Sequence, residues 1–590
     1  MSHQDRTSLS FLACVVKASF VGLKDTYSTC GVLLHPAEGI LLTHGSILAD
    51  FCTSDDTVLS KINAGEVIPS TNFDETSFTV LLDTYWQQIN LRVTQSLTAA
   101  QEISNANPEN NFCLPLKCKA LGAFRAVDFH DAVSKIMPKD SWSFANGTEE
   151  DSITPTGSKN NNDESDKLSE NISFQLLSYF VLLQCVPLVN GAGNLQSLEL
   201  LPANRSTRKE QCIIGAEAEI ISTPFGGLNP YVFFNSYSKG VISNISGRNG
   251  CWILTDARCI PGSEGGPLFT VHQNGARQLS GIIAASLCWK NKEWVGLTLV
   301  CGIDCITETL AFHIKNSLSA LDWHELDPLN SSHHSKSSAP QLPITPNSKG
   351  PKSLNFLPYV VLVKVGRVWG SGFVIDTRKC LILTCSHVVK DASPSDPPIF
   401  IRALNNSRLF KASVIYRQTS QELNPFDLAV LRCPEIMRYL APLKTPKIVP
   451  ALIGQRVWVC GHAVFNTDLG LQPSVCAGVI SKVVKVKGQD VMVQTTCAVH
   501  AGASGGPLLD NDGNLVGIVV CNTVDKGSNS TYPHINFSIP ATTVWPPVLH
   551  YIKSADPSML DSLKVTDTMV KKLWALDTTL ESEYAVKSKL

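Results

Sequence analysis

Three residues in the C-terminal half of the chain could together perform acyl transfer: His387, Asp427 and Ser504. Ser504 lies in HAGASGGPLL, where glycines on both sides permit the tight turn that brings a substrate carbonyl to backbone N–H donors. His387 follows the apolar run LILTCS, and Asp427 directly precedes the run LAVLR. Each string taken alone is compatible with an ordinary turn. Their order, with each string beside a predicted strand, favours nucleophilic catalysis by a serine.

Three neighbouring residues compete for catalytic roles. His500 lies on the same local segment as Ser504 and has no carboxylate near it in sequence, so we expect it to form part of a pocket wall. Cys385 and Cys497 stand in apolar runs and are expected to be buried packing thiols. None of the three is therefore preferred to His387 as the base.

The elements that must position these residues are predicted to be β-strands. Short β-branched runs separated by Gly, Pro and Asn turns predict antiparallel β barrels rather than alternating βαβ units. Only the last 45 or so residues show the spacing of a helix, about 3.6 residues per turn. The runs are YVVLVKVG, GFVIDT, CLILTCS, RVWVCG, AGVISKVV, VMVQTTC and NLVGIVVC.

These strings, with AGVISKV and HINFSIP further on, resemble the chymotrypsin-fold serine proteases, especially their HtrA/Deg branch, over residues 355–540. The resemblance implies that Ser504 attacks the scissile carbonyl, that His387 takes and returns the proton, and that Asp427 orients the imidazole. It also implies that the N–H groups of Gly502 and Ser504 receive the oxyanion. Ala498 stands at the pocket base of this pattern, where Asp would select Lys or Arg, so a trypsin-like preference is not expected.

The N-terminal half repeats the pattern in altered form. GILLTHGSIL matches CLILTCSHVV, SKGVISN matches CAGVISK, and PGSEGGPLF matches AGASGGPLL. In this alignment Ser46, Ser77 and Glu264 fall opposite the candidate His, Asp and Ser. We expect no rescue by the adjacent His44 or Ser263. The first half is therefore predicted to be a scaffold, an inhibitor or a substrate-docking surface.

The expected fold class is all-β, with two tandem chymotrypsin-like double β-barrel domains, the first degenerate, and a short helical C-terminal tail. Polar segments rich in Ser, Asn and Pro mark an insertion and a linker, because they cannot bury enough surface to offset their ordering entropy. The predicted ranges are 1–324 for the degenerate domain with a disordered insertion at 141–173, 325–353 for the linker, 354–545 for the protease domain and 546–590 for the tail.

Composition excludes several classes of protein. Lys and Arg (49) nearly balance Asp and Glu (51), so a nucleic-acid partner is not expected. The 19 cysteines form neither CxxC pairs nor Cys/His clusters, which indicates reduced thiols and neither a metal nor an organic cofactor. Polar residues and Pro187 interrupt the apolar stretch 174–189, so it is predicted to be a buried strand and not a membrane span. The N-terminal apolar run is too short for a secretory signal.

The chain ends in Ser588, Lys589 and Leu590, the tripeptide read by the peroxisomal type-1 import receptor. With its altered first half, the whole chain resembles the peroxisomal leader-peptide processing proteases. This implies removal of type-2 leaders from matrix enzymes such as thiolase, limited cleavage of type-1-targeted β-oxidation enzymes of the acyl-CoA oxidase kind, homo-oligomerisation, and self-cleavage near Cys113 or within 141–173. An HtrA-like quality-control protease and a non-catalytic peptide-binding scaffold remain alternatives.

Overall fold

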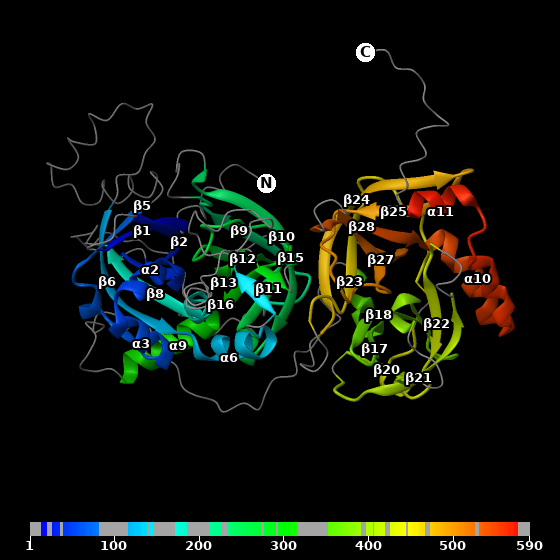
Figure 1. Ribbon diagram of the computed structural model, residues 1–590, viewed down its shortest axis with the longest axis horizontal. Helices are drawn as coiled ribbons and strands as arrows, with labels where there is room; N and C mark the ends of the chain where they lie inside the picture. The colour runs from blue at the N-terminus through cyan, green and yellow to red at the C-terminus, as the bar shows by residue number, and fades with distance from the viewer. Residues whose placement is uncertain are drawn as a thin grey trace, which may run out of the picture. The chain divides into compact units, whose positions relative to one another are not determined.

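The computed structural model divides into two units, Met1–Lys292 with Leu297–Pro340 and Gln341–Leu590 with Glu293–Gly296. They are coloured blue to green and green to red in Figure 1. The structure describes residues 13–575 except for 21–25, 36–38, 82–115, 139–140, 145–170, 186–211, 226–232, 273–276, 287, 291–292, 317–351, 391–396, 405, 419–424, 444–445, 466–471 and 526–529.

The first barrel of the C-terminal unit closes in the order β17-β18-β19-β22-β21-β20. Strand β19 is buried along its whole length, which is why it appears in the sequence as a continuous apolar run. The strands are β17 (Val360–Val365), β18 (Val368–Asp376), β19 (Leu381–Cys385), β20 (Ile399–Arg402), β21 (Phe410–Arg417) and β22 (Leu428–Arg432).

The second barrel of this unit closes in the order β23-β24-β25-β28-β27-β26. All strand pairings in both barrels are antiparallel. The candidate site residues lie at strand ends: His387 after β19, Asp427 before β22 and Ser504 before β26. The strands are β23 (Arg456–Gly461), β24 (Ser474–Val486), β25 (Gln489–Thr495), β26 (Pro507–Asp510), β27 (Leu515–Asp525) and β28 (Ser530–Pro540).

The N-terminal unit repeats this architecture. Its first sheet has the order β4-β6-β5-β1-β2-β3-β8, and pairing of β6 with β8 closes it, while its second barrel is β10-β11-β16-β13-β12-β9. The strands are β1 (Ala13–Phe20), β2 (Thr26–His35), β3 (Ile40–His44), β4 (Ile68–Pro69), β5 (Thr76–Leu81), β6 (Leu116–Arg125), β8 (Tyr179–Cys185), β9 (Glu217–Ser222), β10 (Ser236–Ser246), β11 (Trp252–Thr255), β12 (Pro267–Val271), β13 (Arg277–Ala285) and β16 (Thr298–Gly302). Outside its barrels, β7 (Trp142–Phe144) pairs with β14 (Cys288–Lys290). Strand β15 (Glu293–Val295) belongs to the C-terminal unit.

Helices are more widespread than the sequence analysis predicted, so restricting them to the last 45 residues was wrong. In α6 the residues Phe129, Ala132, Val133 and Ile136 are buried, an amphipathic pattern within only ten residues. The C-terminal helix α10 begins at Ala541 and has two prolines inside it. The helices are α2 (Ala49–Ser54), α3 (Asp56–Ala64), α6 (Val127–Ile136), α9 (Ile303–Asn316), α10 (Ala541–Ser554) and α11 (Thr568–Trp574), with a 3-10 helix η10 (Pro557–Leu563) between the last two.

Four barrels in two pairs confirm the predicted fold class. Strand β8 confirms the buried strand expected within 174–189. Within the predicted insertion 141–173 the structure describes strand β7 and a buried Ile172, whereas 145–170, Cys113 and the terminal tripeptide lie outside the described residues. Among the described residues, no helix has the length and apolar character to cross a membrane.

Candidate active site

His387 and Asp427 are brought together by the pairing of β19 with β22. The register places Cys385 opposite Leu428, so the residues that follow β19 lie beside the residue that precedes β22. The His387 backbone N–H donates to Asp427 Oδ1 at 2.9 Å, and the imidazole Nδ1 donates to Asp427 Oδ2. This contact leaves the Nε2 atom to face a reacting group.

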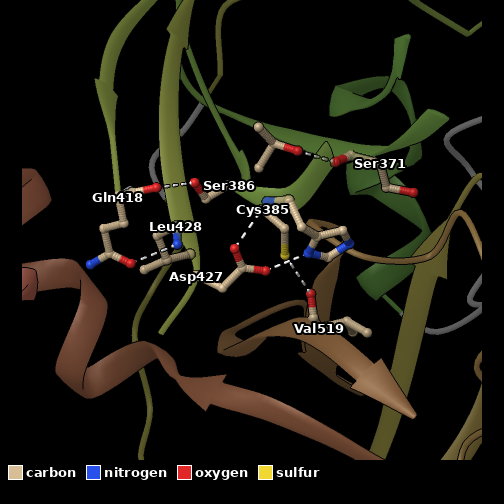
Figure 2. Close-up of polar contacts among 9 residues, drawn as sticks. Ser371, Cys385, Ser386, Gln418, Asp427, Leu428 and Val519 are labelled. Atoms are coloured by element: carbon tan, nitrogen blue, oxygen red, sulfur yellow. Dashed lines mark hydrogen bonds and ion pairs between the residues drawn. The ribbon is translucent and has the colours of Figure 1, made fainter. Parts of the chain in front are cut away.

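The backbone at Asp427 is held in an uncommon conformation. Its φ is +46°, in the left-handed region that non-glycine residues rarely occupy. Its carbonyl accepts the N–H of Ser386 at 2.7 Å, and the N–H of Leu428 donates to Gln418 Oε1. Figure 2 shows Asp427 with Ser386, Gln418 and Leu428 around it.

Ser504 lies on a tight turn that leads into β26. The turn is closed by Ala503 N–H donating to His500 O at 2.9 Å. Gly502 and Gly505 have φ of +95° and +88°. A Cβ at Gly505 would lie 2.2 Å from Ser371 O, so the turn tolerates no side chain there. Ser504 itself is partly exposed between buried neighbours.

Along this turn, N–H groups that donate a hydrogen bond alternate with N–H groups that have no acceptor among the described residues. Those of Ala503, Gly505 and Gly506 all donate to backbone carbonyls. Over the part of the chain that the structure describes, the N–H groups of Gly502 and Ser504 make no hydrogen bond. Two donors separated by one residue are thus left for an external acceptor.

Ser371, which the sequence analysis missed, connects the turn to the barrel that carries His387. Its N–H donates to Ser504 O at 2.8 Å and its Oγ donates to Gly502 O at 2.7 Å. Its own carbonyl accepts the hydroxyl of Thr384, a residue of β19 (Figure 2). The small residues of VWGSGF were the available signal for such a close approach. Within the described contacts, no hydrogen bond joins Ser504 Oγ to His387.

The remaining candidate residues are buried in the interior of the C-terminal unit. Cys385 is fully buried and its Sγ donates to Val519 O at 3.4 Å. Cys497 is fully buried as well, with its Sγ 3.7 Å from Val457 O. His500 and Ala498 are both buried. These positions agree with packing roles for the two thiols.

The corresponding turn of the N-terminal unit has almost the same backbone. Gly262 and Gly265 have φ of +90° and +82°. The N–H of Ser263 donates to Ile260 O. The N–H of Cys30 donates to Glu264 O at 2.8 Å, just as the N–H of Ser371 donates to Ser504 O. The repeat predicted from PGSEGGPLF is therefore present in three dimensions, with Glu264 at the position of Ser504.

The Glu264 side chain fills the position that is open in the other unit. One carboxylate oxygen accepts the N–H of Gly262 at 2.8 Å, and the other accepts the N–H of Ser286 at 3.1 Å. The carboxylate also accepts the hydroxyl of Ser286 and the N–H of Glu264 itself. Burial raises the pKa of this carboxyl, and the surrounding donors oppose that rise. A carboxyl oxygen thus lies against the two alternating N–H groups of this turn, those of Gly262 and Glu264.

The other altered positions of the N-terminal unit are structural as well. His44 is buried: its Nε2 donates to Leu177 O and its Nδ1 accepts the N–H of Ser46. Burial lowers the pKa of His44 to about 4, so the ring is neutral. Ser263 Oγ is hydrogen-bonded to Ser222 Oγ, and Ser46 stands at the position of His387.

The assignment of Ser77 opposite Asp427 was wrong. Ser77 lies in β5, which pairs with β1 and β6, as β20 pairs with β17 and β21. The strand that pairs with β3 is β8, and its register places Phe180 opposite His44. The counterpart of Asp427 is therefore Tyr179, whose hydroxyl donates to Glu66 O at 3.0 Å. A tyrosine there cannot supply the negative charge that orients an imidazolium.

Comparison with known proteins agrees with this geometry. Residues 370–518 match the trypsin-like peptidase domain. The chain is 32% identical over 610 residues to the peroxisomal leader peptide-processing protease of Mus musculus, covering 96% of each chain. It is also 32% identical over 618 residues to that of Homo sapiens, covering 98% of this chain and 97% of the human one. Protease Do-like 1, chloroplastic, of Arabidopsis thaliana is 33% identical over 179 residues, 30% of this chain and 37% of its own.

A pair of closed antiparallel barrels with a trypsin-like peptidase domain defines a serine protease of the chymotrypsin-fold class. The resemblance expected from the sequence motifs is thereby confirmed. Within that class, the chain belongs to the family of peroxisomal leader peptide-processing proteases. Both full-length relatives are named as peroxisomal, and the chain is accordingly a peroxisomal protein, as the sequence predicts.

Proposed function

We propose that His387, Asp427 and Ser504 form the catalytic triad of an endopeptidase. Ser504 Oγ attacks the scissile carbonyl while His387 Nε2 takes its proton, and His387 later returns that proton to the leaving amine. Asp427 holds the Nδ1–H tautomer through the hydrogen bond described above. A water molecule then hydrolyses the acyl-enzyme by the same proton route. The observation that carries this proposal is the His387–Asp427 contact beside the serine turn.

The N-terminal unit supports the assignment of the oxyanion hole in the C-terminal unit. In the N-terminal unit the N–H groups of Gly262 and Glu264 converge on one carboxylate. Gly502 and Ser504 have the same positions in a turn of nearly the same φ values. Their N–H groups should therefore converge on the oxygen that becomes negative in the transition state, and each is worth about 3 kcal/mol of barrier.

A fluorophosphonate probe tests the triad directly, because it reacts only with an activated serine. The wild-type chain is expected to be labelled, and Ser504→Ala is expected to lose all labelling. Asp427→Asn should retain the fold but react about 10⁴-fold more slowly, because the imidazole then prefers the wrong tautomer. Labelling that survives Ser504→Ala would show that another residue is the nucleophile.

Peroxisomal matrix proteins that carry a cleavable leader are the proposed substrates. The names of the two full-length relatives support this choice. Ala498, which is buried, argues against selection of a basic residue before the cleaved bond. Incubation of a thiolase precursor with the wild-type chain should remove the leader at one bond, and Ser504→Ala should leave the precursor intact. Cleavage at many bonds would instead favour broad quality control, and equal results with both chains would refute the proposed function.

Four further assignments are proposed: additional substrates, self-processing, the import signal and the oligomeric state. Enzymes of the acyl-CoA oxidase kind are proposed as further substrates with limited cleavage. Self-processing should give two bands from the wild-type chain and one from Ser504→Ala. Replacement of Leu590 should leave the protein in the cytosol if Ser588, Lys589 and Leu590 form the import signal. Light scattering of the purified chain measures its molar mass, which should be a multiple of the mass of one chain if the protein forms the proposed homo-oligomer.

A further inference from the structure

The segment that follows the second barrel of the C-terminal unit contacts Phe426, which precedes Asp427, and reaches Leu428, which follows it, through Gln418. Gln418 is buried, with 5% of its surface exposed. Its Nε2 donates to Leu563 O of η10 at 3.0 Å, and its Oε1 accepts the N–H of Leu428 at 2.9 Å. One amide side chain thus links η10 to the residue that follows Asp427.

Gln418 also reaches the histidine side of the pair. Its backbone carbonyl accepts the hydroxyl of Ser386, the residue before His387. Its backbone N–H donates to Leu428 O at 3.2 Å. Figure 2 shows the Gln418 backbone carbonyl joined to the Ser386 hydroxyl, and the Gln418 side-chain Oε1 joined to the N–H of Leu428. A shift of Gln418 would therefore move both partners of the His387–Asp427 contact.

The residue that precedes Asp427 is held by α11. The ring of Trp574 meets the ring of Phe426 edge to face, with centroids 6.2 Å apart. Trp574 Nε1 donates to Val491 O at 3.0 Å, which fixes the indole against β25. Phe426 is buried, with 6% exposed, so it cannot relax into solvent without losing this contact.

Asp427 needs such support because its backbone is strained. A φ of +46° is unfavourable for an aspartate and persists only where the surroundings determine it. The contacts of Gln418 and Trp574 bracket this one residue on both sides. The expected result of losing either contact is a local relaxation of the Asp427 turn and a poorly aligned imidazole.

We propose that Gln418 and Trp574 are positioning residues, through which the tail segment 557–574 holds Asp427 and His387 in the geometry for proton transfer. This inference rests on the proposed triad. Neither residue touches the reacting atoms, so both act through Asp427. The tail would then be a part of the active site's support and not a separate appendage.

The test measures the maximal rate of fluorophosphonate labelling and the probe concentration at half that rate. Gln418→Met keeps the volume but removes both side-chain hydrogen bonds, and Trp574→Ala removes the ring against Phe426. Because a misplacement of about 1 Å can cost about 100-fold, we expect the maximal rate to fall about 10- to 100-fold. The half-saturating concentration should stay unchanged, since the probe's own binding surface is intact.

Two matched variants separate positioning from simple destabilisation. Trp574→Phe retains a ring against Phe426 and should recover most of the rate lost in Trp574→Ala. Lys487→Ala removes an exposed ion pair between Lys487 and Asp567, which precedes α11, without touching the neighbours of Asp427. As surface ion pairs contribute little, its rate should stay within about twofold of wild type.

The outcomes distinguish this inference from the proposed function. If wild type is labelled and Ser504→Ala is not, but Gln418→Met and Trp574→Ala react as fast as wild type, the positioning role is refuted while the triad stands. An equal loss of rate in Trp574→Phe and Trp574→Ala would also overturn it. Thermal unfolding of each variant identifies a chain that has failed to fold, and for such a chain the Phe and Lys487 variants decide the question.

Discussion

At the scale of single residues, Glu264 shows how one substitution changes the use of a turn. Its carboxylate satisfies the N–H groups of Gly262 and Ser286 inside the barrel. The backbone that would bind a developing oxyanion instead binds a side chain of the same unit. Glu264 therefore stabilises the N-terminal unit while excluding a substrate carbonyl from it.

Replacing Glu264 by Ser tests this interpretation. The change leaves buried N–H donors without an acceptor, so the unfolding free energy of the N-terminal unit should fall by about 2 to 4 kcal/mol. In a Ser504→Ala background, Glu264→Ser should still give no fluorophosphonate labelling, because Ser46 and Tyr179 stand where the base and its orienting acid are needed. Denaturant unfolding and gel fluorescence measure the two effects. A labelled band would contradict the assignment of Tyr179.

His44 makes the stability of the N-terminal unit depend on pH. Its folded pKa of about 4 lies below the ordinary value near 6.5, so the unfolded chain takes up the proton first on acidification. Stability from the neutral ring is thus complete above pH 6.5 and is lost as the pH falls toward 4. Between pH 7.5 and pH 5 the loss amounts to about 2 kcal/mol.

His44→Gln keeps a donor and an acceptor but does not titrate, so its stability should vary less with pH by about that amount. Unfolding of the N-terminal unit at the two pH values, followed by pulse proteolysis, measures the difference. His550→Gln, which lies in the C-terminal unit, is the control and should leave the unfolding of the N-terminal unit as it is in the wild type. The same pH slope in His44→Gln as in the wild type would show that the pKa of His44 does not differ between the folded and unfolded chain.

At the scale of elements, strands were predictable and their partners were not. Runs such as LILTC and RVWVCG became β19 and β23, because barrel interiors demand continuous or alternating apolar residues. The same requirement explains why the prediction of Ser77 was wrong, because the apolar run after Ser77 resembles the run after Asp427. The pairing of β8 with β3 is what identifies Tyr179 as the counterpart of Asp427.

Two features of the structure, one beside the site and one in the N-terminal unit, were missed from the sequence. Gln418 acquires its role from Leu563, a contact between residues 145 positions apart, and a glutamine has no local signature for it. Helix α6 did carry an amphipathic pattern, but it is short and lies among strands, so strand signals dominated the region. The predictions of His387 and Asp427 came from the apolar runs beside them, and that of Ser504 from the glycines on both sides of it.

The paired turns give a matched test at this scale. Gly505→Ala should abolish labelling, since its Cβ would lie 2.2 Å from Ser371 O. Gly265→Ala meets Cys30 O at the same distance, 2.2 Å, and should destabilise the N-terminal unit while Ser504 remains reactive. Both changes add strain from a positive φ as well. Equal loss of labelling in the two variants would show that the units do not act independently in catalysis.

At the scale of the whole molecule, the chain relies on apolar cores rather than covalent cross-links. The 17 cysteines whose side chains the structure describes are free, and most are buried. The unfolding temperature should therefore be the same with and without dithiothreitol. Titration of the denatured chain with Ellman's reagent should detect at least 17 thiols. A smaller number, or a lower unfolding temperature after reduction, would reveal a stabilising disulfide.

The Glu264 carboxyl group, which the turn of the N-terminal unit binds, also suggests how a cleavage product could bind to the turn of the C-terminal unit. If Ser504 is the nucleophile, as proposed, every peptide bond that it cleaves creates a new C-terminal carboxyl group, the same chemical group as the Glu264 side chain. The N–H groups of Gly502 and Ser504, which have no acceptor among the described residues, are suited to retain it. On the proposed mechanism, we therefore expect the cleavage fragments to compete with the substrate for this turn.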